Sequence, residues 1–172
     1  QTTTLENKDF LVKITHPWLD TQCCSVTEPA IAKLNEIAVL AQSKDKLGNT
    51  IPPDKITDKL GIFGVPKNNE SFELFLNKQK QALIKEFQVV EGKNPVNTKE
   101  TLVNLGYGER SLTGVKLEGY AWWGKVILAE HPYSNYFLIF VIPNGASLEF
   151  EGIVEDILAN IVFLKPSEVV KE

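Results

Sequence analysis

The stretch YFLIFVIPNGASLEFEGIVEDILANIVF, residues 136–163, decides the fold of this chain. Its first seven residues form an unbroken apolar run, which is typical of a strand buried on both faces. The turn residues Pro143, Asn144 and Gly145 close that run. Apolar residues then recur at the spacing of an amphipathic helix, at Phe150, Ile153, Val154, Ile157, Leu158 and Ile161. A buried strand followed at once by such a helix indicates a helix that lies on its own sheet.

The rest of the chain extends this pattern to an α+β fold. Ser71 caps a second amphipathic helix over residues 71–87, and the closing helix covers residues 149–160. Further strands are predicted at residues 10–15, 100–105, 110–118 and 120–129. Because short glycine-containing turns separate most of them, the strands should form an antiparallel meander. We therefore predict an antiparallel sheet with amphipathic helices packed on it as an α/β/α sandwich, which buries Phe75, Leu83, Ile153 and Ile157.

Three segments are harder to assign. Thr27 and Pro29 form a helix start, and the following apolar spacing predicts a helix over residues 27–42. The part from 37 to 41 could equally be a short strand, since periodicity does not separate the two for so short a run. Residues 1–8 are expected to be a flexible lead-in.

Residues 43–70 contain several prolines and glycines, and they are expected to form a long irregular connection with one helical turn within 54–60. With 172 residues, the chain is expected to be a single domain over residues 1–172.

Composition excludes some classes of function. The chain is 43% hydrophobic and carries a net charge of −4, with Lys and Arg spread along its length. Nucleic-acid binders concentrate basic residues on one face, so this distribution argues against a nucleic-acid partner. No apolar stretch approaches the ~20 residues that cross a bilayer, and we predict no transmembrane segment. The expected partner is a protein or a small ligand.

The start of the chain bears on its compartment. The sequence contains no Met, so Gln1 is not a translation start. Either a targeting segment has been removed or the chain is cut from a longer one. A polar end after a removed segment also suits a lipid anchor upstream of Gln1. We expect an extracytoplasmic protein of the periplasm, the cell envelope or the secreted fraction.

The cysteines provide the parts of a possible catalytic centre. Cys23 and Cys24 could act with His16 or His131 as base, and Asp20 could orient that base. Adjacent Cα atoms lie ~3.8 Å apart, whereas ordinary disulfides need ~4.4–6.8 Å, so a bond between the two would be an uncommon, strained one. No thiol-enzyme signature surrounds the pair. A small hydrolase or thiol enzyme is therefore the alternative to a binding protein.

Metal and cofactor sites have no support in the sequence. Structural zinc sites show paired short spacings such as C-x-x-C or H-x-x-x-H, and neither occurs here. Both histidines precede proline, where a polar ring simply ends a strand. No phosphate-binding loop is present, and we predict neither a metal nor a cofactor.

Four apolar residues are candidates for a binding surface. Trp122 and Trp123 are adjacent in a predicted strand, so their side chains should point to opposite faces, and one of them could be exposed. Ile62 and Phe63 lie in the expected 43–70 connection, where exposed apolar side chains would serve as anchors. The alternative is that Ile62 and Phe63 cover an open edge of the sheet.

The order of these elements resembles a known family. The segments are DFLVKITHPW, SFELFLNKQKQALIKEF, TLVNLGYGERSLTGVKLEGYAWWGKVILAE, YFLIFVIPNG and FEGIVEDILANIVF. Together they resemble the PsbP-like α/β/α domain of the extrinsic photosystem II subunit and of small bacterial envelope lipoproteins, over most of residues 8–165. The resemblance implies a non-enzymatic accessory or binding module and transfers no catalytic residue. A cytosolic adaptor or immunity-type protein remains compatible with the same composition.

Overall fold

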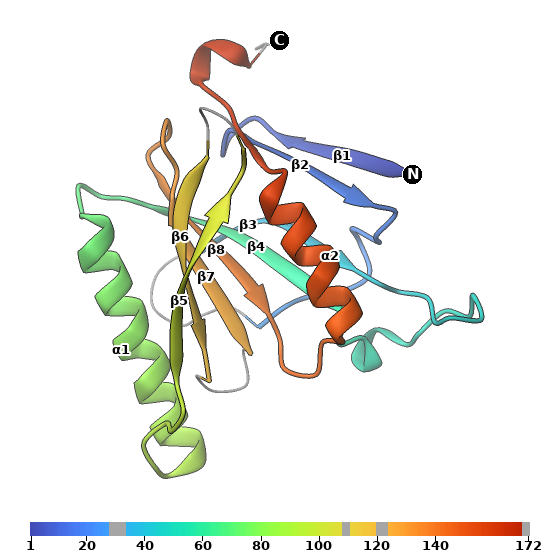
Figure 1. Ribbon diagram of the computed structural model, residues 1–172, viewed down its shortest axis with the longest axis horizontal. Helices are drawn as coiled ribbons and strands as arrows, with labels where there is room; N and C mark the ends of the chain where they lie inside the picture. Colours follow the sequence, from blue (N-terminus) through green and yellow to red (C-terminus); the bar gives the residue numbers. More distant parts are fainter. Residues whose placement is uncertain (28–33, 108–110, 120–123, 170–172) are drawn as a thin grey trace.

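The computed structural model describes residues 1–27, 34–107, 111–119 and 124–169. Across these ranges the chain forms two antiparallel sheets and two α-helices, as Figure 1 shows. The predicted α+β fold with an antiparallel sheet is therefore confirmed.

The larger sheet has six strands, and the apolar run of residues 136–142 lies near its centre. In spatial order the strands are β3 (Asn35–Ala41), β4 (Lys59–Pro66), β8 (Tyr136–Ile142), β7 (Lys125–Glu130), β6 (Leu112–Glu118) and β5 (Lys99–Leu105). All neighbouring pairs are antiparallel. Every residue of β8 after Tyr136 is buried, because the strand lies between β4 and β7 and both faces of the sheet are covered.

The smaller sheet corrects two expectations. It consists of β1 (Thr2–Asn7), β2 (Val12–Pro17) and β9 (Val162–Phe163). Residues 1–8 are thus largely a strand paired with β2, and the prediction of a flexible lead-in was wrong. The predicted strand 10–15 corresponds to β2 and belongs to this second sheet, outside the main meander. The first strand was missed because none of its residues is buried: exposed and half-buried positions alternate, as expected for an edge strand.

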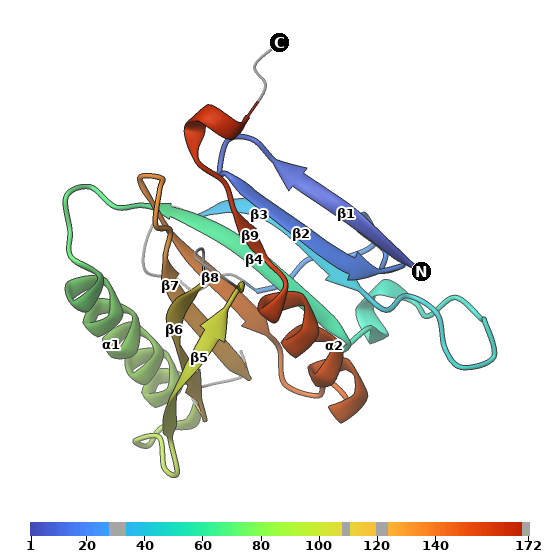
Figure 2. The same cartoon turned by 45° about the horizontal axis from the view of Figure 1, so that its top comes forward.

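The two helices cover opposite faces of the larger sheet, as Figures 1 and 2 show. Helix α1 (Phe72–Glu91) begins at Ser71, whose Oγ accepts a hydrogen bond from the Leu74 N–H, and ends at Gly92 with a φ of 68°. Helix α2 (Leu148–Ala159) begins at Ser147 in the same way. One core cluster forms under α1, and the other forms between α2, the small sheet and the other face.

The predicted core of the helices is largely correct. Phe75, Leu83 and Ile157 are buried, whereas Ile153 is only partly buried. Neither α1 nor α2 is long and apolar enough to span a bilayer, and no other helix among the described residues is.

The segment 27–42 is a strand in its described second half. Residues 35–41 form β3, which resolves the helix-or-strand ambiguity of residues 37–41 in favour of the strand. Residues 28–33 lie outside the described ranges. Burial decides this outcome, because Ala38 to Ala41 are all buried and pair with β4.

The expected irregular connection 43–70 contains β4, the second strand of the large sheet. Only the short 3₁₀ turn Pro53–Lys55 corresponds to the expected helical turn. Gly61 and Gly64 suggested turns, but both pair with the neighbouring strands β3 and β8 and lie inside β4. A Cβ on Gly64 would collide with the ring of Phe10, and one on Gly61 would meet Phe63 and Val26. A second 3₁₀ turn, Pro166–Glu168, follows β9.

Candidate functional site

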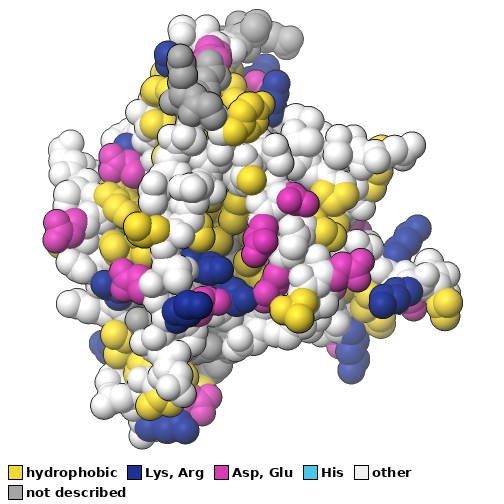
Figure 3. All heavy atoms as spheres, viewed as in Figure 1, with side chains coloured by type: hydrophobic (Ala, Val, Ile, Leu, Met, Phe, Trp, Pro, Cys, Tyr) yellow, Lys and Arg dark blue, Asp and Glu magenta, His cyan; other side chains and the backbone are white. Residues whose placement is uncertain are grey.

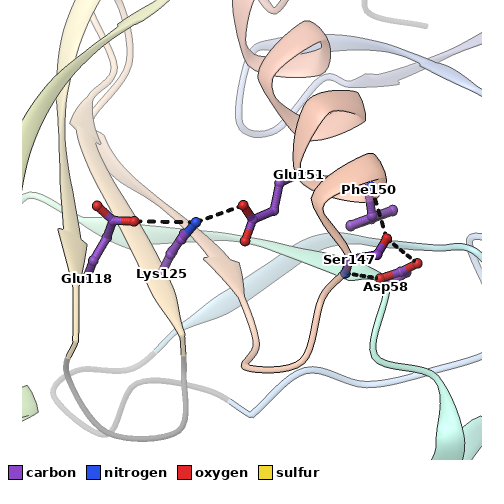
Figure 4. A network of polar contacts seen from close by, with 6 residues as sticks. All are labelled: Asp58, Glu118, Lys125, Ser147, Phe150 and Glu151. Atoms are coloured by element: carbon purple, nitrogen blue, oxygen red, sulfur yellow. Dashed lines mark hydrogen bonds and ion pairs between the residues drawn. The ribbon is translucent and has the colours of Figure 1, made fainter.

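The start of α2 is attached to the larger sheet through Asp58, the residue just before β4. Its carboxylate accepts hydrogen bonds from the Ser147 backbone N–H at 2.7 Å and from the Ser147 hydroxyl at 2.9 Å. The same hydroxyl oxygen accepts the Phe150 N–H at 3.1 Å, as Figure 4 shows. An aspartate therefore fixes the capping side chain itself, and this holds the first turn of α2 in place.

A charged triad ties the next part of α2 to the sheet. The Lys125 ammonium on β7 lies 2.8 Å from Glu151 on α2 and 3.4 Å from Glu118 on β6 (Figure 4). Burial alone would lower the pKa of Lys125, but the hydrogen bonds and charges of Glu151 and Glu118 outweigh burial and raise its pKa. Lys125 is therefore held as an ammonium.

Strand register explains why these charges face α2. Glu118 pairs with Lys125, and Lys116 pairs with Ile127, so the four side chains share one face of the sheet. Ile127 belongs to the core cluster that contains α2. At the β6 and β7 end, a face that is apolar elsewhere thus carries two lysines and a glutamate.

α2 leaves part of this face uncovered, and the result is a cavity of about 210 Å³, which we call the charged cleft. It is lined by Val103, Asn104, Lys116, Lys125, Ile127, Ile142, Glu151, Val154, Glu155 and Leu158. In Figure 3, basic and acidic side chains gather near the centre of this view around apolar ones. The cleft therefore has apolar surfaces from both the sheet and the helix, with charges beside them.

Two charged groups of the cleft have no protein partner. Lys125 and Glu151 neutralise one another, whereas Lys116 on the sheet and Glu155 on the helix have no ion-pair or hydrogen-bond partner among the described residues. Lys116 is also half-buried. A ligand with a carboxylate and an ammonium could satisfy both groups while its apolar body covers the apolar lining.

The predicted anchors Ile62 and Phe63 are not on the surface. Both lie in β4, and they are 1% and 0% exposed. The prediction that these two residues form an exposed binding surface is therefore wrong. They are buried because β4 lies between β3 and β8 and is covered on both faces. Trp122 and Trp123 lie outside the described residues.

The cysteines are bonded to each other. The uncommon bridge between Cys23 and Cys24 is present, so neither sulfur is a thiol in this structure. The described residues lining the hollow beside this bond, which include Lys59 and Asp54, contain no histidine. Asp20 uses one carboxylate oxygen to accept the Gln22 N–H at 2.8 Å. The structure does not assemble the thiol, histidine and aspartate of the alternative hypothesis.

His131 is fully buried, and both of its ring nitrogens are occupied. Nε2 lies 2.8 Å from the Leu11 carbonyl and donates to it, while Nδ1 accepts the backbone N–H groups of Tyr133 and Ser134 at 2.9 and 3.0 Å. Burial lowers the pKa of His131, the Leu11 carbonyl opposes this, and the charge of Lys67 adds to it. The neutral ring therefore holds the β7–β8 turn against the start of β2.

His16 is buried, and its Nδ1 lies 2.6 Å from the Pro17 carbonyl. The described residues contain no group of three or more His, Cys, Asp or Glu side chains that could hold a metal ion.

Sequence reasoning missed the charged cleft, although the strand that forms its floor carried a signal. In LTGVKLE, residues 112–118, Gly114, Lys116 and Glu118 alternate with buried Val115 and Leu117. Such alternation is ordinarily a solvated face. Only the register and the position of α2 show that these charges border a cavity.

No known protein family matches the sequence, and no curated protein shows significant similarity to it.

Proposed function

We propose that the chain is a non-enzymatic binding module whose charged cleft takes a small zwitterionic ligand with a branched apolar body. Such a ligand is a free apolar amino acid, which carries both charges. The observation that carries the proposal is that Lys116 and Glu155, on opposite walls of a cavity with apolar lining, have no ion-pair or hydrogen-bond partner among the described residues. Charge-assisted hydrogen bonds would hold the carboxylate and the ammonium of the ligand.

The size of the cleft supports a small ligand. Its volume of about 210 Å³ lies below the ~300–1,000 Å³ of pockets that hold drug-sized molecules. Val103, Ile127 and Val154 offer methyl groups rather than aromatic rings to the ligand. This favours a compact branched aliphatic body over a flat aromatic one.

The chemistry of the lining supports binding over catalysis. The described lining residues include no hydroxyl, thiol or imidazole, so the nucleophile–base pairs that Ser, Thr or Cys forms with His have no members here. Lys125 is held protonated by Glu151 and Glu118, so it can neither attack a substrate nor accept a proton.

Three probes with closely similar aliphatic bodies test this proposal. L-leucine carries both charges, 4-methylpentanoate carries only the carboxylate, and 3-methylbutylamine carries only the ammonium. Isothermal titration calorimetry should show saturable binding of leucine and weaker binding of both other probes. Loss of one charge-assisted hydrogen bond corresponds to about tenfold or more in Kd.

Matched variants test which residue of the cleft binds the carboxylate of the ligand and which binds its ammonium. Lys116→Met should weaken leucine and 4-methylpentanoate, whereas Glu155→Gln should weaken leucine and 3-methylbutylamine. Lys85→Met, an exposed lysine on α1, is the control and should change neither. If leucine does not bind, or binds Lys116→Met equally well, the proposed function is wrong.

We also propose that the module is PsbP-like and acts outside the cytoplasm. The α/β/α layering supports the first part, as an analogy of fold alone. The Cys23–Cys24 bond supports the second, since disulfides persist in oxidising compartments. A signal peptide and a lipid-attachment site in the precursor sequence would be in accord with this proposal. A precursor sequence without a targeting signal would contradict it.

A further inference from the structure

A second hollow lies between the small sheet and α2, and its residues play no part in the charged cleft apart from sharing the helix. Its volume is about 700 Å³, within the ~300–1,000 Å³ range of ligand pockets. One wall is the outer face of β1 and β2, and the other is a side of α2. We call it the hydroxyl groove.

Threonine hydroxyls form the sheet wall. Thr4 pairs with Thr15 and Thr2 with Pro17, so these residues share the face of the small sheet opposite to buried Val12 and Ile14. The hydroxyl oxygens of Thr4 and Thr15 lie 3.3 Å apart. Each hydroxyl still has capacity to donate or accept a further hydrogen bond.

The helix wall supplies an acceptor pair beside an apolar strip. Ile153, Asp156 and Ile157 on α2 lie at i, i+3 and i+4, the C-cap residue Asn160 follows at i+7, and all four line the groove. The Asp156 carboxylate has no partner among the described residues. The Asn160 side-chain N–H donates to the Asp156 backbone carbonyl at 2.8 Å, which leaves the amide oxygen as an acceptor.

An exposed aromatic ring also borders the groove. Tyr107 is 65% exposed and lies two residues after the end of β5. The preceding residue, Gly106, has a φ of 73° and donates its N–H to the Leu158 carbonyl at 2.8 Å. The chain just before Tyr107 is therefore fixed against the end of α2, although the ring itself is largely uncovered.

We propose that the hydroxyl groove binds a short neutral oligosaccharide. Several neutral hydrogen-bonding groups, a carboxylate acceptor and an exposed ring match a ligand with many hydroxyls and apolar C–H faces. Among the described residues, Lys13 is the one lysine that lines the groove, and Glu6 lies opposite it in the strand register, so an anionic ligand would find little net positive charge. A peptide strand would need an open backbone edge, whereas the face of a sheet and a helix form these walls.

The test uses three neutral probes, maltotriose, cellotriose and triacetylchitotriose, with saturation-transfer NMR and calorimetry on the full chain. At least one should bind. Tyr107→Ala and Asp156→Ala should each weaken that probe about tenfold, while Tyr107→Phe, which keeps the ring, should change its Kd by less than about threefold. Glu149→Ala, an exposed change at the start of α2, is the control.

Circular dichroism of each variant confirms that the fold is retained. If none of the three probes binds, or if Tyr107→Ala binds as tightly as the original chain, the proposal is overturned. Lys116→Met should leave the oligosaccharide unaffected, and Tyr107→Ala should leave leucine unaffected. A failure of this inference is thereby distinguishable from a failure of the proposed function.

Discussion

The two faces of the large sheet differ most at strands β6 and β7. On β6 and β7, the residues facing α1 are Val115, Leu117, Val126 and Leu128, and all are buried and apolar. The alternate residues facing α2 are Gly114, Lys116, Glu118, Lys125 and Ile127. One face thus stabilises the fold by burial, whereas the other leaves charged groups around a cavity. Neighbouring residues of one strand can therefore serve stability and binding separately.

The largest predicted effect comes from placing a charge on the apolar face of β6, the face that packs against α1. Leu117→Lys would place an ammonium in the apolar core under α1, where Leu117 is 1% exposed. We expect a loss of more than about 4 kcal/mol in the free energy of unfolding, because an unpaired charge is buried there. Urea denaturation measures it.

The matched control is Lys116→Leu, the adjacent residue on the other face, which should change the unfolding free energy by less than about 1 kcal/mol. Equal destabilisation by the two substitutions would show that the faces do not differ as described.

A second prediction concerns pH and the joint between the two sheets. Because the pKa of His131 is lowered in the fold, the unfolded chain takes up a proton first as pH falls. The contribution of neutral His131 to the free energy of unfolding should be fully present above pH 6.5, the ordinary pKa. It should decrease as the pH is lowered from 6.5 to the lowered pKa of the folded state. The maximum slope from one group is about 1.4 kcal/mol per pH unit.

Urea unfolding at several pH values between 5 and 8 measures this slope, and His131→Gln is the reference variant. Carboxylates contribute to both proteins, so the informative quantity is the difference in slope. An identical slope in His131→Gln would contradict the assigned role of the buried ring.

A third prediction compares ion pairs on the two faces. A double-mutant cycle of Lys125→Met with Glu151→Gln should give a coupling of about 0.5–1 kcal/mol, since both side chains are more than two-thirds buried. The control cycle uses Lys80 and Glu100, a pair at 3.3 Å that joins α1 to β5 and is more exposed at its glutamate. Its coupling should be smaller and should vanish more readily with salt. Equal couplings would remove this distinction.

The smallest expected effect concerns the bonded cysteines. Cys23→Ser together with Cys24→Ser should lower the unfolding free energy by less than about 1 kcal/mol, because a bond between neighbours closes almost no loop. Thermal denaturation of the double variant measures it, and intact-mass spectrometry of the original chain reports whether the bond is formed. A loss of several kcal/mol would show a larger structural role.

The sequence predicted those elements whose signal is local. Residues 136–142 and both helices were recognised because apolar periodicity, capping serines and turn residues agree within one segment. β4 was missed because Gly61 and Gly64 read as turns, although Gly64 makes room for the ring of Phe10 and Gly61 for Val26 and Phe63. The strand 2–7 was missed because its own sequence pattern is weak and the strand is held by its pairing with β2.

The candidate site was not predictable in the same way. Lys116 and Glu155 are separated by 38 intervening residues and are brought to one cavity by the strand register and by the packing of α2. Ile62 and Phe63 were chosen as exposed apolar residues of a loop, but tertiary pairing buries them. Both outcomes depend on contacts between distant segments, which a single sequence does not display.

The most direct test of the central claim is where leucine perturbs the backbone. In a titration followed by ¹H–¹⁵N correlation NMR, the account predicts shifts at Val103, Lys116 and Val154, which line the charged cleft. The amides of Phe75 and Leu83 on α1, across the sheet, should stay unchanged. Shifts confined to α1, or none at saturating leucine, would contradict the assignment of binding to the α2 face.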